Sequence, residues 1–118
     1  MNRTLLAFII LLTYQAVPSS AQRHTVVIHN GFLKASDYLD MDAENQRAYA
    51  MGLLDGMYMA PNFGAPDNNK LLIKVATCVE GMKSSQVAAI IEKYVRDHPD
   101  HWQWDLKDMG YNAMLQAC

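Results

Sequence analysis

Residues 84–99 read SSQVAAIIEKYVRDHP, and their large apolar side chains recur at three- and four-residue intervals. This spacing places the apolar side chains on one face of an α-helix, so it predicts an amphipathic helix whose apolar face other helices must cover. Ser84 or Ser85 is suited to cap the start of this helix, and Pro99 is expected to end it. The apolar face consists of Val87, Ile90, Ile91, Tyr94 and Val95.

The sequence on both sides predicts further helical segments. Residues 36–41 suit a short helical turn, and Asp42 is suited to cap a longer helix that runs from residue 43 to about residue 60, before Pro61. Residues 70–79 predict a third helix. These patterns predict an all-α fold, a small bundle of about four to five helices. The inward stripe of a last helix is predicted to be Leu106, Met109, Gly110, Ala113, Met114 and Ala117.

The helix predicted from residue 43 onwards is apolar on nearly all sides, which is typical of a central helix. Gly52 and Gly56 lie four residues apart in it, and each lowers helix stability by up to about 1 kcal/mol relative to alanine. Close approach of a neighbouring backbone is the expected compensation. Asp55 is the polar exception, and we expect its carboxylate to accept hydrogen bonds from a neighbouring helix end or a tyrosine.

The beginning of the chain has the layout of an export signal. Arg3 supplies the positive charge, residues 5–12 form the apolar run, and small residues stand at Ser19 and Ala21, where signal peptidase prefers them. The apolar run is far shorter than the roughly 20 residues that span a bilayer. The predicted division is a cleaved signal peptide over residues 1–21 and a single helical domain over residues 22–118, which starts with an extended arm over residues 22–33.

The charge of the predicted mature chain narrows the classes of partner. After cleavage it carries nine lysine and arginine residues against twelve aspartate and glutamate residues, a net charge of −3. The cations are scattered along the sequence, whereas phosphate binding needs a concentrated basic face. We therefore expect no nucleic-acid partner, and no membrane association after the signal is removed.

Both cysteines of the chain, Cys78 and Cys118, lie in the predicted mature part. Disulfides persist in the compartment that an exported protein enters, and two thiols allow only one pairing. The two cysteines lack the paired spacing of a zinc site, and the terminal position of Cys118 is unusual for a nucleophile. We predict a disulfide between Cys78 and Cys118 that fixes the last helix across the core.

Residues that carry chemistry are few. His98 and His101 stand three residues apart with aspartates nearby, which is a weak signature of a metal site. Pro99 breaks the helix between them, so the two rings need not share a face. No Ser, Cys or Thr lies in a nucleophile motif, and no glycine-rich phosphate loop follows a strand. We therefore predict a protein that is not an enzyme and that uses no metal or other cofactor.

Several short motifs follow one another in the predicted mature chain. They are a Gly-x-x-Asp-Gly core in a helix, a cysteine before a glutamine-bearing helix, a His-Pro pair and a closing cysteine. The stretches are YAMGLLDG at 49–56, CVEGMKSSQ at 78–86, Tyr94-Val95, His98-Pro99, Ala113-Met114 and Cys118. Together these motifs resemble the Rap/Tai family of periplasmic immunity proteins, and the similarity spans residues 31–118.

The resemblance implies a small all-helical protein of the periplasm, often a homodimer, that binds a peptidoglycan amidase effector of type VI secretion. Inhibition would be steric, because a loop or helix edge would enter the groove of the toxin and cover its Cys-His catalytic centre. In this chain the polar loop that follows Pro61, with one aromatic anchor, is the candidate segment. The candidate partner-binding residues are Asn62, Phe63, Asp67, Asn68 and Asn69.

Two alternatives belong to other classes of protein. A small periplasmic acid-stress chaperone, or holdase, would share the size, the export signal and the single disulfide. Such a protein would expose apolar surface as its carboxylates become protonated. A metal-binding periplasmic module would instead use His98, His101 and methionine side chains.

Overall fold

The computed structural model describes residues 31–118. The predicted signal peptide, residues 1–21, and residues 22–30 of the predicted extended arm therefore lie outside the described residues. The described part contains five α-helices and two short 3-10 helices, so the prediction of a small all-α bundle is confirmed. Its β-structure consists of one isolated bridge between Lys34 and Asp105. The elements are α1 (Ala35–Asp40), α2 (Ala43–Tyr58), η1 (Ala60–Phe63), α3 (Lys70–Val79), α4 (Ser84–Asp97), η2 (Pro99–His101) and α5 (Leu106–Ala117).

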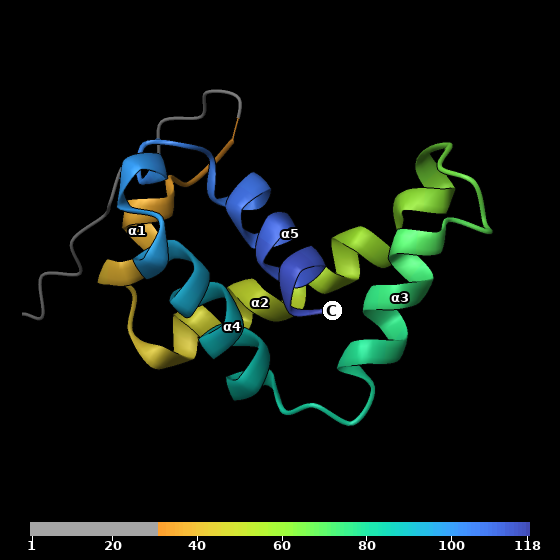
Figure 1. The fold of residues 1–118 in the computed structure, drawn as a ribbon, viewed down its shortest axis with the longest axis horizontal. Coiled ribbons are helices and arrows are strands. Elements are labelled where there is room, and N and C mark those ends of the chain that lie inside the picture. The colour runs from red at the N-terminus through yellow and green to blue at the C-terminus, as the bar shows by residue number, and fades with distance from the viewer. Residues whose placement is uncertain (1–30) are drawn as a thin grey trace, which may run out of the picture.

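Helix α4 organises the core, as its strongly amphipathic sequence predicts. It packs against α1, α2 and α5, which gather around it in Figure 1. Val87, Ile91 and Val95 of its apolar face are buried, while Ile90 and Tyr94 are partly covered. The inward stripe of α5 is confirmed with one exception, since Ala117 is exposed. Its buried members are Leu106, Met109, Gly110, Ala113 and Met114.

Tyr38 joins α1 to two other helices from the centre of the core. Its side chain is fully buried, and its hydroxyl donates to the backbone oxygens of Gln46 (3.3 Å) and Ala88 (3.1 Å). In return, Nε2 of Gln46 donates to the Tyr38 carbonyl oxygen at 2.9 Å. These bonds satisfy polar groups that would otherwise be costly to bury, so the short helix α1 has a fixed place.

Of the caps predicted for the starts of α2 and α4, the first is correct and the second is wrong. Asp42 caps α2, since its Oδ1 accepts the Asn45 backbone N–H at 2.8 Å. The predicted serine cap of α4 is wrong, because Ser84 is already the first helical residue and Lys83 is the cap. The Gln86 side chain reaches back instead, and its Oε1 accepts the Lys83 backbone N–H at 2.8 Å. This bond fixes the chain entering the helix, as in the second half of a capping box.

The prediction that α2 is buried on nearly all sides is wrong. Ala50, Leu54 and Met57 are buried, but Met51 and Tyr58 each remain 42% exposed. The reason is that α4 and α5 cover the inner side of the helix and leave its outer side open. Asp55 lies on this open side and is exposed, so the hydrogen bonds expected for a buried carboxylate are not formed.

The expected close approach of helices at Gly52 and Gly56 is also wrong. A Cβ atom added at either glycine would meet nothing within 4 Å. The close approach is found at Gly110 of α5, where an added Cβ would lie 2.6 Å from Leu53 Cδ2. The glycine that packing requires is therefore on α5, and it receives a side chain from α2.

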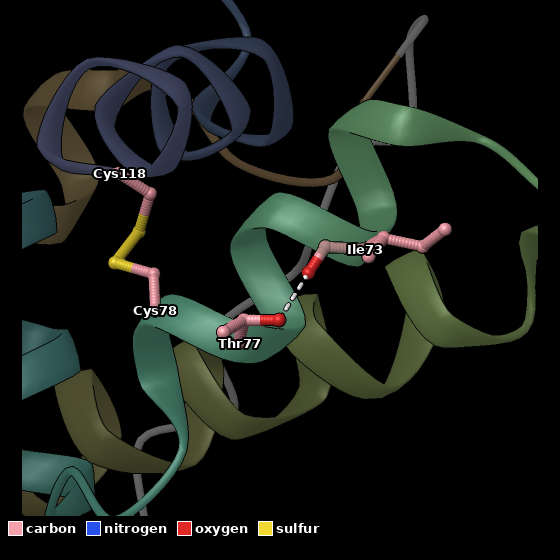
Figure 2. The surroundings of a disulfide bond; sticks show 4 residues. All are labelled: Ile73, Thr77, Cys78 and Cys118. Atoms are coloured by element: carbon pink, nitrogen blue, oxygen red, sulfur yellow. Dashed lines mark hydrogen bonds between the residues drawn. A yellow bond between two sulfur atoms is a disulfide. The ribbon is translucent and has the colours of Figure 1, made fainter.

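The predicted disulfide between Cys78 and Cys118 is confirmed, with a Cα–Cα distance of 5.7 Å. It fastens the end of α3 to the last residue of the chain, directly after α5 (Figure 2). Figure 2 also shows the Thr77 hydroxyl, which donates to the Ile73 carbonyl oxygen at 3.0 Å. Helix α3 contributes Val75 to the core and packs against α5, so the crosslink reinforces this contact.

Candidate protein-binding surface

Large apolar side chains that remain exposed concentrate in one stretch of the described chain. Nine such side chains are exposed in residues 31–118, and six of them lie between residues 51 and 73. This stretch runs from the middle of α2 through η1 to the start of α3, and its part around η1 lies at the end of the molecule away from α1 (Figure 1). We call it the distal surface. Its exposed apolar members are Met51, Tyr58, Met59, Phe63, Leu71 and Ile73.

The backbone around η1 explains why Phe63 points outwards. Helix α2 ends at Tyr58, before Pro61, and Pro61 stands at the start of the tighter η1 turn. Gly64 then takes a left-handed conformation with φ of 99°, which glycine adopts without strain. Its N–H donates to the Pro61 carbonyl oxygen at 3.1 Å. Phe63 therefore sits on hydrogen-bonded backbone while its side chain is 83% exposed.

All five candidate partner-binding residues fall on the distal surface, but in different roles. Asn62 and Phe63 belong to η1 rather than to a loop, while Asp67 and Asn68 are exposed in the turn that follows. Asn69 serves the fold as the cap of α3. Its Oδ1 accepts the backbone N–H groups of the next two helical residues at 3.0 and 3.3 Å. The side chain of Asn69 is therefore already engaged.

Sequence reasoning missed the remaining apolar members of the distal surface. Met51 and Tyr58 lie on α2, for which the apolar sequence predicted a central helix, and Ile73 of α3 was not singled out. The available signal was the pair Gly52 and Gly56, which stand beside Met51 and Tyr58 on the open face of α2. Two glycines on one face of a helix leave that face with fewer side chains to pack against a neighbouring helix.

The electrostatics of the distal surface suit an apolar contact with a polar margin. Partial burial raises the pKa of the Tyr58 hydroxyl, and the neighbouring Asp55 carboxylate adds to the shift. Tyr58 is therefore neutral at physiological pH, and its ring presents apolar area with a polar tip. Asp67 and Lys70 are exposed at the margin of the same surface.

A second group of aromatic residues follows α4. The rings of Tyr94, His98, His101 and Trp104 stack in sequence, with centroid distances of 4.1, 6.1 and 3.8 Å. His98 Nδ1 lies 2.7 Å from the Tyr94 carbonyl oxygen. The indole N–H of Trp102 donates to the Val95 carbonyl oxygen at 2.8 Å. These contacts give the histidines a packing role at the corner between α4 and α5.

The same histidines were the candidate metal ligands. Within residues 31–118, no group of three or more His, Cys, Asp or Glu side chains is placed to hold a metal ion. A hollow of about 260 Å³ between α4 and α5 is lined by Tyr94, His98 and Gln116, among others. Lys93 and Asp97 on its rim form an ion pair with each other. The hollow therefore has no cluster of free charges.

None of the helices in the described part is long and apolar enough to cross a membrane. Comparison of the chain with family models, with curated proteins and with solved structures found no match. Residues 31–118 thus define a disulfide-linked helical bundle with exposed apolar side chains around η1.

Proposed function

We propose that this protein is a periplasmic immunity protein that binds a peptidoglycan amidase effector of type VI secretion and blocks its active site sterically. The observation that carries the proposal is the distal surface, where a Phe63 side chain that is 83% exposed stands on ordered backbone. The resemblance of the sequence to the Rap/Tai family supplies the class of partner.

The physical argument starts from the cost of exposing such side chains. Monomeric proteins rarely leave extended apolar area in water, and where they do it commonly marks an interaction site. Aromatic anchors at the centre of an interface supply a large share of binding free energy. The hydrogen-bonded turn around Gly64 holds the backbone at Phe63 before binding, which lowers the backbone part of the entropic cost of association.

Inhibition by this surface would require no chemistry from the bound protein. Phe63 would enter the substrate groove of the amidase, and Asn62, Asp67 and Asn68 would hydrogen-bond around it. Access of peptidoglycan to the catalytic cysteine would then be blocked while the complex lasts. The predicted signal peptide over residues 1–21 would deliver the protein to the periplasm, where such an effector acts.

The test is an inhibition assay with the purified, oxidised chain of residues 22–118 and amidases encoded beside its gene. We expect one amidase to lose peptidoglycan hydrolysis at a stoichiometric ratio. Phe63→Ala should weaken that complex by at least about tenfold, because loss of a central aromatic anchor costs at least about 1.4 kcal/mol. Phe32→Ala is the matched control, since Phe32 is 68% exposed outside the distal surface.

Three results would count against the proposal. Retained hydrolysis by every neighbouring amidase at tenfold excess of the protein would remove the inhibitory role. Equal loss of affinity in the Phe63 and Phe32 variants would show that the amidase does not bind at the distal surface. Suppression of aggregation of unrelated clients near pH 2 to 3, with no amidase inhibited, would assign the protein to the holdase class.

A further inference from the structure

The structure contains a second, larger hollow, at the end of the molecule away from η1 (Figure 1). Its volume is about 680 Å³, and it lies where α1 meets the start of α2. We call it the α1–α2 hollow. Residues of three segments line it, namely the chain before α1, the helix α1 with its end, and the first two turns of α2. They are Leu33, Asp37, Asp40, Met41, Asp42, Asn45, Ala48 and Tyr49.

The floor of the α1–α2 hollow is apolar. Leu33, Met41 and Tyr49 each pack against the core with one side and remain partly uncovered on the other. Tyr49 is held in place by an edge contact with the ring of Tyr38, at a centroid distance of 5.7 Å. Uncovered apolar area on a fixed floor favours burial by another segment of chain.

The rim of the hollow is negatively charged. Asp37, Asp40 and Asp42 line it, and no lysine or arginine is among the lining residues. Asp37 accepts the Lys34 backbone N–H, and Asp42 caps α2. Asp40 is exposed and makes no hydrogen bond or ion pair with another described residue. The hollow therefore favours a segment that combines apolar side chains with positive charge.

The chain enters the described fold at the edge of this hollow. Gly31 packs closely against Asp105. A Cβ atom added at Gly31 would lie only 3.0 Å from the Asp105 Cγ atom. Leu33, which lines the hollow, accepts the Leu106 backbone N–H at 2.9 Å. The preceding nine residues, 22–30, can reach at most about 30 Å when fully extended. The hollow lies well within that reach.

We propose that the α1–α2 hollow is the binding site for residues 22–30 of the same chain, QRHTVVIHN. This segment contains Arg23, two histidines and no acidic residue, and its centre is the apolar run Val26, Val27 and Ile28. Its charge and its apolar centre complement the rim and the floor of the hollow. The short connection through Gly31 also gives the segment a millimolar effective concentration at the hollow, on the order of that for short flexible linkers.

This proposal is independent of the amidase-binding role, because α1 lies at the other end of the molecule from η1, the turn that carries Phe63 (Figure 1). Its test uses the oxidised chain of residues 22–118 without any partner. In nuclear magnetic resonance spectra we expect cross-relaxation between the Tyr49 ring and the methyl groups of Val26, Val27 or Ile28. The backbone amides of those residues should exchange at least about tenfold more slowly than in a free peptide of the same sequence.

Charge variants test whether the negative rim of the hollow contributes to binding of residues 22–30. Asp40→Asn and Arg23→Gln should each speed the exchange of the Val26 to Ile28 amides by about threefold. If the two charges act on each other, the amides of the double variant should exchange no faster than those of either single variant. Asp40 is exposed and without a described partner, so its substitution leaves folding intact, which circular dichroism would verify. Asp67→Asn on the distal surface is the matched control and should leave the exchange unchanged.

Two outcomes would overturn the proposal. Exchange of these amides within twofold of the free peptide, without contacts to Tyr49, would show that the segment does not bind the hollow. Contacts that appear only between labelled and unlabelled copies in a mixed sample would assign the hollow to the segment of a second molecule.

Discussion

At the scale of single residues, removal of the Tyr38 hydroxyl should lower the stability of the fold, because this group contacts two other helices. Its two acceptors belong to α2 and α4, so one O–H group links three helices. Tyr38→Phe should lower the free energy of unfolding by about 1–2 kcal/mol, because buried carbonyl oxygens lose a donor. Urea denaturation measures this change. Tyr58→Phe is the control and should stay within about 0.5 kcal/mol, since Tyr58 is exposed.

Tyr49 should make the fold sensitive to alkaline pH. Burial raises the pKa of its hydroxyl to about 12, and the Asp108 carboxylate adds to the shift. The unfolded chain releases this proton near pH 10, whereas the folded chain retains it, so stability is complete below pH 10 and falls as the pH rises towards 12. We expect a loss of about 1 kcal/mol by pH 11 from this residue. Tyr49→Phe should flatten the measured curve of stability against pH, and an unchanged curve would contradict this assignment.

At the scale of elements, the glycines of α2 and α5 should respond in opposite ways to alanine. Gly52→Ala should stabilise the protein by about 0.5–1 kcal/mol, because the site is open and alanine favours the helix. Gly110→Ala should bring no gain, because its Cβ would lie 2.6 Å from Leu53 Cδ2. Thermal denaturation of the two variants compares them directly. A Gly52 variant less stable than the parent chain would show that the outer face of α2 is covered.

The helices themselves were largely predictable from local sequence. The start and end of α3 at residues 70 and 79 follow the sequence prediction, because Asn69 provides a side-chain cap and Gly81 interrupts the pattern. The start of α2 follows from Asp42 for the same reason. Helix α2 was misjudged in its burial, because apolar composition does not tell which of its sides other helices will cover.

At the scale of the whole molecule, the disulfide should contribute a large share of stability. It closes a loop with a sequence separation of 40 residues, and the entropic model assigns such a loop about 4 kcal/mol. Replacing Cys78 and Cys118 together by serine should lower the unfolding free energy by about that amount. Amide exchange should rise more in α3 than in α4, because α3 depends on its link to α5. Equal increases in both helices would contradict a local role of the crosslink.

The same crosslink should govern the candidate binding surface. The distal surface includes the start of α3, whose far end is tied to Cys118 (Figures 1 and 2). Freedom of α3 would leave the positions of Leu71 and Ile73 relative to α2 unfixed. If the distal surface binds an amidase, the serine variant should inhibit it less well than the oxidised chain, even at a temperature where the core remains folded. Inhibition assays at 10 °C would measure this difference.

The sequence by itself determined the helical class, most helix boundaries and the disulfide. These features depend on local spacing, on capping residues and on the presence of only two cysteines, so one residue and its neighbours specify them. Only the tertiary structure decided which face of α2 stays open, that Gly110 receives Leu53, and that Tyr38 bonds to Ala88, 50 residues away. Such contacts depend on how distant helices pack, because the packing of facing side chains is not encoded in the spacing of either helix alone.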